Sequence, residues 1–389
     1  MRVALSPIPP INGSFGRAPT FGILSSYPPT ACGLATFTAA LSDGLSSHGA
    51  EVRVVRVADG TGAPSPRVIG ELHNGSPASV AATADLLNQC DVAVIQHEYG
   101  LFGGPDGDEV LEVLAKLRVP SIVIAHTILR DPTPHQREVL VDAVALADQV
   151  VVMSEAARLR LCSTFAVDPS RVVTIAHGAA IPPPGLFRKP GARPIMLTWG
   201  LLGPGKGIER VIEAMPALQE LPMGPRYLVA GRTHPKVLAA DGELYRETRM
   251  AQARRLGVAE SVCFDDGYRD LDALNALIAA SAVVVLPYDS ADQVTSGVLV
   301  DAIAAGKPVV ATAFAHAEEL LASGAGLVVP HDDPDAMASA LRRVLVEPGL
   351  AQRMAAEASR LAPALGWPVV AGKYLRLARS LVTARPVLV

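Results

Sequence analysis

The sequence has few cysteines, little net charge and no long apolar run, and each shortage excludes a class of protein. Only four cysteines occur among 389 residues, with no CxxC spacing, so we interpret them as small core residues in a reducing cytoplasm: Cys32, Cys90, Cys162 and Cys263. The formal net charge of −4 argues against nucleic acid as the main partner. No run of about 18 apolar residues is free of charges, proline and glycine, so we expect no transmembrane segment. The first residues, MRVALSPIPPING, lack the features of a signal peptide, and we expect a cytoplasmic protein.

Two further signatures are missing. No predicted strand is followed by GxGxxG with an acidic residue about 20 positions later, which argues against an NAD-dependent dehydrogenase. The aspartates at 265, 266, 289 and 292 resemble metal-binding DxD pairs, but no other carboxylate or histidine stands with them at ligand spacing. We therefore interpret them as turn and cap residues.

Short β-branched apolar runs alternate with amphipathic stretches along the chain, which predicts parallel sheets covered by helices on both faces. The alternation is broken over 181–194, where five prolines and two glycines indicate a linker. We predict an α/β protein of two doubly wound, Rossmann-like domains, 1–184 and 195–366, with a linker at 185–194. A last helix, 367–382, follows a break at Pro363, and the segment 367–389 crosses back to the first domain. The predicted strands are 21–25, 51–57, 91–96, 121–125, 149–153, 172–175, 195–198, 227–230, 261–264, 283–286, 308–311 and 327–329.

A glycine-rich loop lies in 196–215 (MLTWGLLGPGKGIERVIEAM), between a predicted strand and an amphipathic helix. Its glycines allow backbone N–H groups to approach an anion, and the helix start and Lys206 add positive charge. We therefore predict a phosphate or diphosphate site, with a tight turn and a solvated lysine as the alternative. The spacing is close to the Walker A pattern, but Gly207 stands where a Ser or Thr would bind Mg²⁺, which argues against a P-loop ATPase.

A second anion site is predicted after the strand at 283–286, in VVVLPYDSADQVTSGVLVDAIAAGKPVVAT. Thr295, Ser296 and Gly297 would present hydroxyl and N–H groups at the start of a helix. Asp301 follows about one and a half turns later, where its carboxylate could accept hydrogen bonds from the vicinal hydroxyls of a ribose. A solvated helix residue is the alternative for Asp301.

Polar residues also follow strands of the first half. The stretch QHEYGLFGG places His97 and Glu98 at the end of one strand, and His126 follows another strand in IVIAHTIL. These positions suit sugar contacts or acid–base work, although a histidine at a strand end is often only structural. Gly33, in the loop PPTACGLAT, would let the backbone approach a ligand held by the other domain; an ordinary turn is the alternative.

Taken together, these motifs resemble the retaining glycosyltransferases of family 4, which have the GT-B architecture of two facing Rossmann-like domains around a cleft. The resemblance rests on CGLATF, QHEYGLFGG, AHTIL, AHGAAIPPP, GLLGPGKGIERVIEAM, DQVTSGVLVDAIAAGKPVVAT, GAGLVVPHDDPDAMASAL and a tryptophan, Trp367, that opens the last helix.

The resemblance implies roles that agree with the sites above. Lys206 would hold the donor diphosphate, Gly33 would face it, and the backbone of 295–298, including Val298, would hold the distal phosphate. Asp301 would bind the ribose hydroxyls, and His126 would contact the transferred sugar. The loop 267–269, with Tyr268, would lie beside the nucleobase.

Two positions depart from the family pattern. Leu201 stands where the family has an arginine, and Arg232 is our candidate substitute. The family's two glutamates, separated by seven residues, are here Gln293 and Asp301. Gln293 can hydrogen-bond sugar hydroxyls but cannot stabilise positive charge, so Asp292 is the alternative for that task.

The resemblance thus implies a metal-independent hexosyltransferase that needs no cofactor. Its donor would be a nucleoside-diphosphate sugar of the UDP-glucose or GDP-mannose type. The catalytic residues would be His126, Lys206 and Gln293, and His97 and Glu98 would contact the sugar or the acceptor. The acceptor, a saccharide, glycolipid or small molecule, and the oligomeric state stay open. The alternatives are a non-hydrolysing nucleotide-sugar 2-epimerase and a non-catalytic sugar-nucleotide binding protein.

Overall fold

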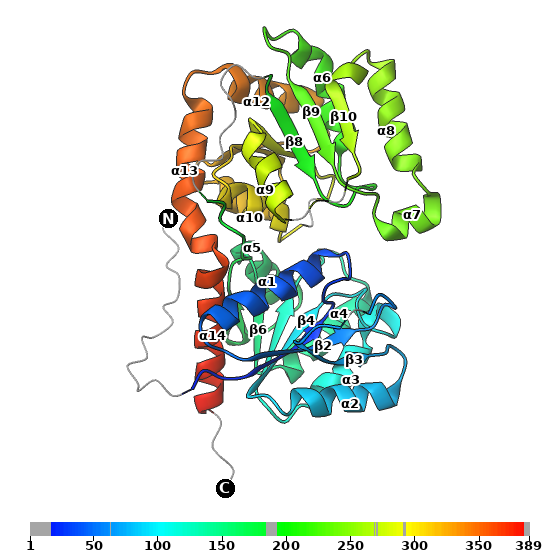
Figure 1. Cartoon of the computed structure of the whole chain (residues 1–389), viewed down its shortest axis with the longest axis vertical. Helices are drawn as coiled ribbons and strands as arrows, with labels where there is room; N and C mark the ends of the chain where they lie inside the picture. Colours follow the sequence, from blue (N-terminus) through cyan, green and yellow to red (C-terminus); the bar gives the residue numbers. More distant parts are fainter. Residues whose placement is uncertain are drawn as a thin grey trace.

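The protein folds into two parallel β-sheets, each flanked by helices, that lie one above the other along the long axis of the molecule (Figure 1). The structure is a computed structural model, and it describes residues 17–62, 64–183, 193–267, 269, 271–290 and 293–384. The two-sheet α/β fold predicted from the sequence is confirmed. None of the helices in these ranges is long and apolar enough to cross a bilayer.

The first sheet has the strand order β3-β2-β1-β4-β5-β6-β7, and all of its neighbouring strands are parallel. Its strands are β1 (Phe21–Ser25), β2 (Val52–Val57), β3 (Val68–Leu72), β4 (Val92–His97), β5 (Ser121–Ala125), β6 (Gln149–Val152) and β7 (Val172–Thr174). The helices between them are α1 (Gly33–Ser47), α2 (Pro77–Leu87), α3 (Glu109–Ala115), α4 (Pro134–Leu146) and α5 (Glu155–Thr164).

The second sheet has the order β10-β9-β8-β11-β12-β13, again parallel throughout. Its strands are β8 (Ile195–Trp199), β9 (Arg226–Ala230), β10 (Val262–Asp265), β11 (Val283–Leu286), β12 (Val309–Thr312) and β13 (Gly326–Val329). Its helices are α6 (Ile208–Gln219), α7 (Pro235–Asp241), α8 (Leu244–Arg255), α9 (Leu271–Ala280), α10 (Gly297–Ala304), α11 (Ala315–Leu321), α12 (Pro334–Val346) and α13 (Leu350–Leu365).

Each sheet is buried on both faces, because successive residues of a strand point to opposite sides. In β1, Ile23 and Leu24 are both fully buried but belong to different hydrophobic clusters, one on each face of the sheet. This double burial explains why the strands are continuous apolar runs rather than alternating ones.

In both sheets the strand order reverses in the middle, between β1 and β4 and between β8 and β11. Loops after the carboxyl ends of strands on either side of such a reversal diverge and leave room for a ligand. The predicted site residues follow these strands: Gly33 after β1, Glu98 after β4, Lys206 after β8 and the segment 293–298 after β11.

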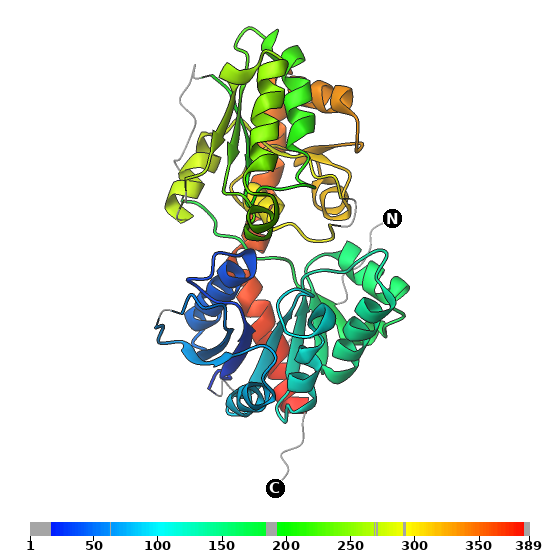
Figure 2. The same ribbon diagram turned by 90° about the vertical axis from the view of Figure 1, so that its right-hand side faces the viewer.

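The last helix, α14 (Trp367–Ala384), returns to the first domain and packs on α1 (Figures 1 and 2). The rings of Phe37 and Trp367 meet edge to face at 5.0 Å. At Gly44 the two helices approach so closely that a Cβ atom would lie 2.7 Å from the Ala371 methyl group. Helix α13 packs instead on α10, so the α13–α14 pair runs along both domains.

The structure corrects three details of the sequence analysis. Strand β3 was not predicted, because VIGEL contains Gly70 and Glu71 and lies at a sheet edge where only Leu72 is buried. Pro363 does not end a helix: α13 continues to Leu365, since its apolar face is packed and a proline removes only one backbone hydrogen bond.

Only Cys90 of the four cysteines is buried as predicted, and Cys162 and Cys263 are partly exposed. Cys32 is the partly exposed N-cap of α1, where its sulfur accepts a hydrogen bond from the Ala35 N–H at 3.3 Å. The predicted linker falls almost wholly on 184–192, outside the described residues.

Candidate functional site

The glycine-rich loop after β8 packs against the loop after β11. Gly205 accepts a hydrogen bond from the Asp289 N–H at 3.0 Å. Gly207 has φ of 62° and caps α6, and a Cβ atom there would lie 1.7 Å from the Pro287 carbonyl oxygen. A serine or threonine therefore cannot replace Gly207 without moving the backbone, which removes the P-loop ATPase interpretation.

Lys206 is a partly buried cation without a carboxylate partner among the described residues. Its ammonium lies 4.7 Å from the centre of the Tyr288 ring, a cation–π contact. Burial lowers the pKa of Lys206, because an ammonium loses hydration there. An anion beside it would compensate that loss.

The sequence analysis predicts that the backbone of 295–298 holds the distal phosphate. In the structure the Ser296 N–H is already hydrogen-bonded, and two N–H groups at the start of α10 are left to bind an anion. Ser296 is the N-cap: its hydroxyl accepts from the Leu299 N–H, and its own N–H donates to Nδ1 of His316 at 2.9 Å. The N–H groups of Gly297 and Val298 donate to no acceptor among the described residues, as expected in a first helical turn. The Thr295 hydroxyl is buried and likewise lacks a partner there.

Asp301 lies one turn further along α10, in an otherwise apolar stretch. Burial raises its pKa to about 7, because a carboxylate is poorly solvated there. Within the described ranges no hydrogen bond or ion pair satisfies this carboxylate. Gln293, at the beginning of the loop, donates from Nε2 to the Thr295 carbonyl at 3.0 Å, which leaves its side-chain oxygen available.

The structure describes some of the remaining second-domain candidates, and others lie outside the described residues. Arg232 is exposed after β9, and its backbone pairs with Leu202 beside the glycine-rich loop. Leu201 adds no charge. Tyr268 and Asp292 lie outside the described residues. Asp265 and Asp289 each pair with an arginine, Arg269 and Arg210 respectively, and thus act as loop-stabilising residues.

His126 is held in one tautomer by a chain of hydrogen bonds in the first domain. The Thr38 hydroxyl donates to the Leu34 carbonyl, and the Gln96 amide donates to Thr38 at 2.6 Å. The Gln96 oxygen must then accept, at 2.8 Å, from Nε2–H of His126. Nδ1 of His126 is left as an acceptor, and burial lowers its pKa to about 3, so the ring is neutral.

The other first-domain candidates lie at or beyond the ends of strands β1 and β4 of the same sheet. His97 is buried at the end of β4, with 1% exposure, so its side chain lies beneath the surface rather than at it. Glu98 accepts hydrogen bonds from Thr127 and from the Tyr99 N–H, and burial raises its pKa. Gly33 is exposed at the start of α1, with no atom within 4 Å of where a Cβ would lie, so ligand atoms have room there.

An aromatic cluster brings the two domains' candidates together. Phe37 packs edge to face on His126 at 5.0 Å and on His177 at 5.1 Å. His177 in turn lies against the start of α10, 3.1 Å from where a Cβ of Gly297 would be. The neutral histidine of the first domain and the free N–H groups of the second therefore lie around one junction.

Sequence reasoning missed four residues of this junction: Gln96, Phe37, His177 and His316. His177 and His316 follow β7 and β12, so the strand-end argument used for His126 could have found them. Gln96 and Phe37 carried no such signal, because their importance comes from contacts between distant segments.

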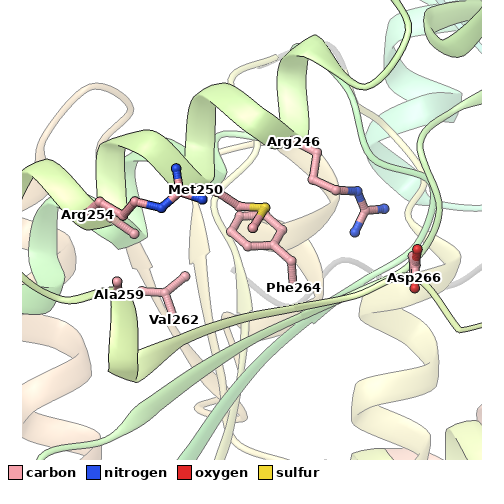
Figure 3. A pocket seen from close by; sticks show the side chains of 8 residues that line it. Arg246, Met250, Arg254, Ala259, Val262, Phe264 and Asp266 are labelled. Atoms are coloured by element: carbon pink, nitrogen blue, oxygen red, sulfur yellow. The ribbon is translucent and has the colours of Figure 1, made fainter.

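A separate hollow of about 290 Å³ lies on the outer flank of the second domain, between α8 and the edge strand β10 (Figure 3). Met250 and Phe264 form its apolar middle, and Arg246 and Asp266 lie near one end. Lys206 is not among the residues that line this hollow, and strand β9 lies between β8 and the edge strand β10.

Comparison with known proteins gives both halves the same assignment. Residues 31–180 match the family model "Glycosyltransferase Family 4", and residues 193–347 match "Glycosyl transferases group 1". Two curated relatives are D-inositol 3-phosphate glycosyltransferases. The one from Kineococcus radiotolerans is 28% identical over 62% of this chain, and the one from Actinosynnema mirum is 27% identical over 64%. The matched regions span only 59% and 64% of those relatives' own lengths.

Solved structures share the fold along nearly the whole chain. A glycosyltransferase from Rickettsia africae has a TM-score of 0.74 at 13% identity, covering 94% of this chain and 99% of that one. Anabaena HepE in complex with UDP has a TM-score of 0.74 at 18% identity, covering 93% and 100%. Since each sheet matches a glycosyltransferase model and the two-sheet fold matches these structures, this protein belongs to the GT-B glycosyltransferases.

Proposed function

We propose that the protein transfers a hexose, with retention of configuration and without a metal ion, from a nucleoside-diphosphate sugar to a hydroxyl acceptor. The observation that carries the proposal lies in the second domain: among the described residues, the Lys206 ammonium has no carboxylate partner and the Gly297 and Val298 N–H groups have no acceptor. Amide groups, a helix start and a cation together form a site for a diphosphate.

The nature of the donor is supported by the neighbours and by Asp301. Anabaena HepE is described in complex with UDP and with UDP-glucose. In this chain the Asp301 carboxylate, which has no partner within the described ranges, would accept two hydrogen bonds from the vicinal hydroxyls of a ribose. We therefore propose a UDP-sugar as the first donor to test, with a GDP-sugar as the second.

In the proposed reaction, the bond between the anomeric carbon and the diphosphate oxygen breaks as the acceptor oxygen bonds to that carbon on the same face. The proton of the acceptor hydroxyl moves to the departing diphosphate oxygen. Lys206 and the α10 N–H groups stabilise the charge that gathers on this leaving group. His126 accepts a hydrogen bond from a sugar hydroxyl at Nδ1, and its neutral ring adds no repulsion to the positive anomeric carbon.

A non-catalytic sugar-nucleotide binding protein is the second candidate, and two residues favour it. Gln293 is an amide where the resemblance implies a carboxylate, and Leu201 replaces a cation. The protein would then bind the diphosphate tightly but transfer nothing.

The deciding experiment begins with thermal unfolding in UDP, GDP and their hexose conjugates, because a ligand at 100 times its Kd stabilises a protein by about 2.7 kcal/mol. The donor that binds is then incubated with an acceptor panel that includes inositol phosphate, the substrate named for the curated relatives. An α-linked product from an α-linked donor supports the proposal. Binding without transfer to any acceptor supports the second candidate, and isomerised donor without acceptor supports an epimerase.

A further inference from the structure

Helix α11 contacts the start of α10 with its first turn. His316 is buried, and its Nδ1 accepts the hydrogen bond from the Ser296 N–H. Because Ser296 is the N-cap of α10, this bond fixes the residue from which the free Gly297 and Val298 N–H groups are presented. The His316 backbone N–H also approaches the Gln293 carbonyl, at 3.4 Å.

The next turn of the same helix contacts the first domain. Both carboxylate oxygens of Glu319 accept hydrogen bonds from first-turn N–H groups of α5, from Glu155 at 2.9 Å and from Ala156 at 2.7 Å. These N–H groups have no acceptor inside their own helix, and a negative charge at a helix start is favourable. A second-domain carboxylate thus caps a first-domain helix, and α5 lies directly beside the domain junction (Figure 1).

Val294, in the loop that leads into α10, contacts the first domain directly. Its side chain is 3% exposed and belongs to the hydrophobic cluster of the first domain, although the residue precedes α10 of the second. The hydroxyl of Ser154, the N-cap of α5, donates a hydrogen bond to the Val294 carbonyl. We call residues 293–298 the donor-binding loop. It is held by His316 of α11 in its own domain and by Ser154 of α5 in the first domain.

We propose that α11 couples the orientation of the two domains to the order of the donor-binding loop, with His316 and Glu319 as positioning residues. When α5 is docked on Glu319, the helix holds Ser296 and the free α10 N–H groups in place. When α5 is released from Glu319, the Gly297 and Val298 N–H groups of α10 lose their fixed direction. The inference rests on the proposed function only in taking these N–H groups as part of the phosphate site.

The first test compares Glu319→Ala with Glu318→Ala, a matched control at the neighbouring exposed position of α11, where the described residues show no hydrogen bond to α5. Hydrogen–deuterium exchange should become faster in the first turn of α5 and also in the first turn of α10. The Kd for UDP, measured by calorimetry, should rise about threefold to tenfold, as for the loss of one or two hydrogen bonds. The control should change neither quantity.

Faster exchange confined to α5, with a Kd within twofold of the wild type, would show that Glu319 is only a helix cap and overturn the coupling. The result is separable from the proposed function. If neither UDP nor GDP binds the wild-type protein, the proposed function fails, while the exchange of α10 in Glu319→Ala still supports or overturns the coupling.

The second test replaces His316 by asparagine and by leucine. The asparagine oxygen can take the place of Nδ1 as the acceptor for the Ser296 N–H, whereas leucine cannot. We expect His316→Asn to keep the UDP Kd within about threefold and His316→Leu to raise it about tenfold. Equal affinities in the two folded variants would overturn the role of His316; should the leucine variant not fold, a tenfold loss in His316→Asn would do so.

Discussion

The two faces that meet at the domain junction differ in charge. On the second-domain face, Lys206 has no carboxylate partner within the described residues, and the Gly297 and Val298 N–H groups have no acceptor there. On the first-domain face, His126 is neutral and is bonded to an uncharged amide, that of Gln96. In the proposed reaction, the second-domain face would bind an anion and the first-domain face would orient hydroxyl groups.

This difference separates two tasks that one transferase must perform. A leaving diphosphate needs positive charge, and it needs more as the bond breaks. The sugar gains positive charge at its anomeric carbon, so a cationic histidine beside it would oppose the reaction. In the proposed reaction, the environment that lowers the His126 pKa would therefore favour the same step as the charge on Lys206.

Lys206→Ala should have the largest effect on activity. Of the cations we considered for the diphosphate, Lys206 is the one whose position in the structure supports that role. We expect turnover to fall about 10²–10³-fold. The midpoint of thermal unfolding should stay nearly unchanged, since the ammonium forms no ion pair among the described residues. Lys206→Arg keeps the charge and should retain more activity; a Lys206→Ala enzyme within threefold of wild type would remove the distinction between the faces.

His126→Ala tests the neutral face. Turnover should fall about 10–100-fold, because a hydrogen bond to the sugar is lost in the transition state. The Kd for UDP should stay within twofold, since the histidine is not assigned to the diphosphate. Gln96→Glu provides a companion variant: the new carboxylate should raise the pKa of His126, which NMR titration would detect, and a charged ring should slow the reaction. A large change in UDP affinity in His126→Ala would show that the two tasks are not separate.

Gly207→Ser tests whether the glycine-rich loop is shaped for close packing. Because a Cβ atom would meet the Pro287 carbonyl, we expect the free energy of unfolding to drop by about 3 kcal/mol or more. Gly205→Ala is the matched control: φ is also positive there, 89°, but nothing lies within 4 Å, so the cost should be about 1 kcal/mol. Equal losses in chemical denaturation would show that packing against β11 is not the constraint.

Asp301→Asn should have the smallest effect, and its sign depends on pH. Burial raises the Asp301 pKa from 3.8 to about 7 in the folded protein, so its stability contribution is full below the unfolded value and is lost as the pH rises through 7. The variant should therefore be more stable than wild type at pH 8, by about 1–2 kcal/mol, and not at pH 4. Urea denaturation at both pH values measures this, and a difference that does not change with pH would contradict it.

The fold and the strand-end positions could be predicted because they follow from local patterns. Runs such as VAVIQH and SIVIAH show burial on both faces, and polar residues directly after them must lie at the carboxyl edge of the sheet. Strand β3 lacked that pattern, since VIGEL is only half buried.

The details of the site could not be predicted, because they depend on contacts between distant segments. Ser296 looked like a free donor until His316, 20 residues later, was found to accept its N–H. The tautomer of His126 depends on Gln96 and Thr38, which lie 30 and 88 positions before it in the chain. His97 sits at a strand end like His126, yet it is buried, and the ring of Tyr99 packs edge to face against it.

The central claim is that Lys206 and the start of α10 together bind a diphosphate without a bridging metal ion. A crystal structure with UDP tests it most directly. The account predicts phosphate oxygens at about 2.7–3.2 Å from Lys206 Nζ and from the N–H groups of Gly297 and Val298. Phosphates bound away from these groups, or held through a divalent ion instead, would contradict it.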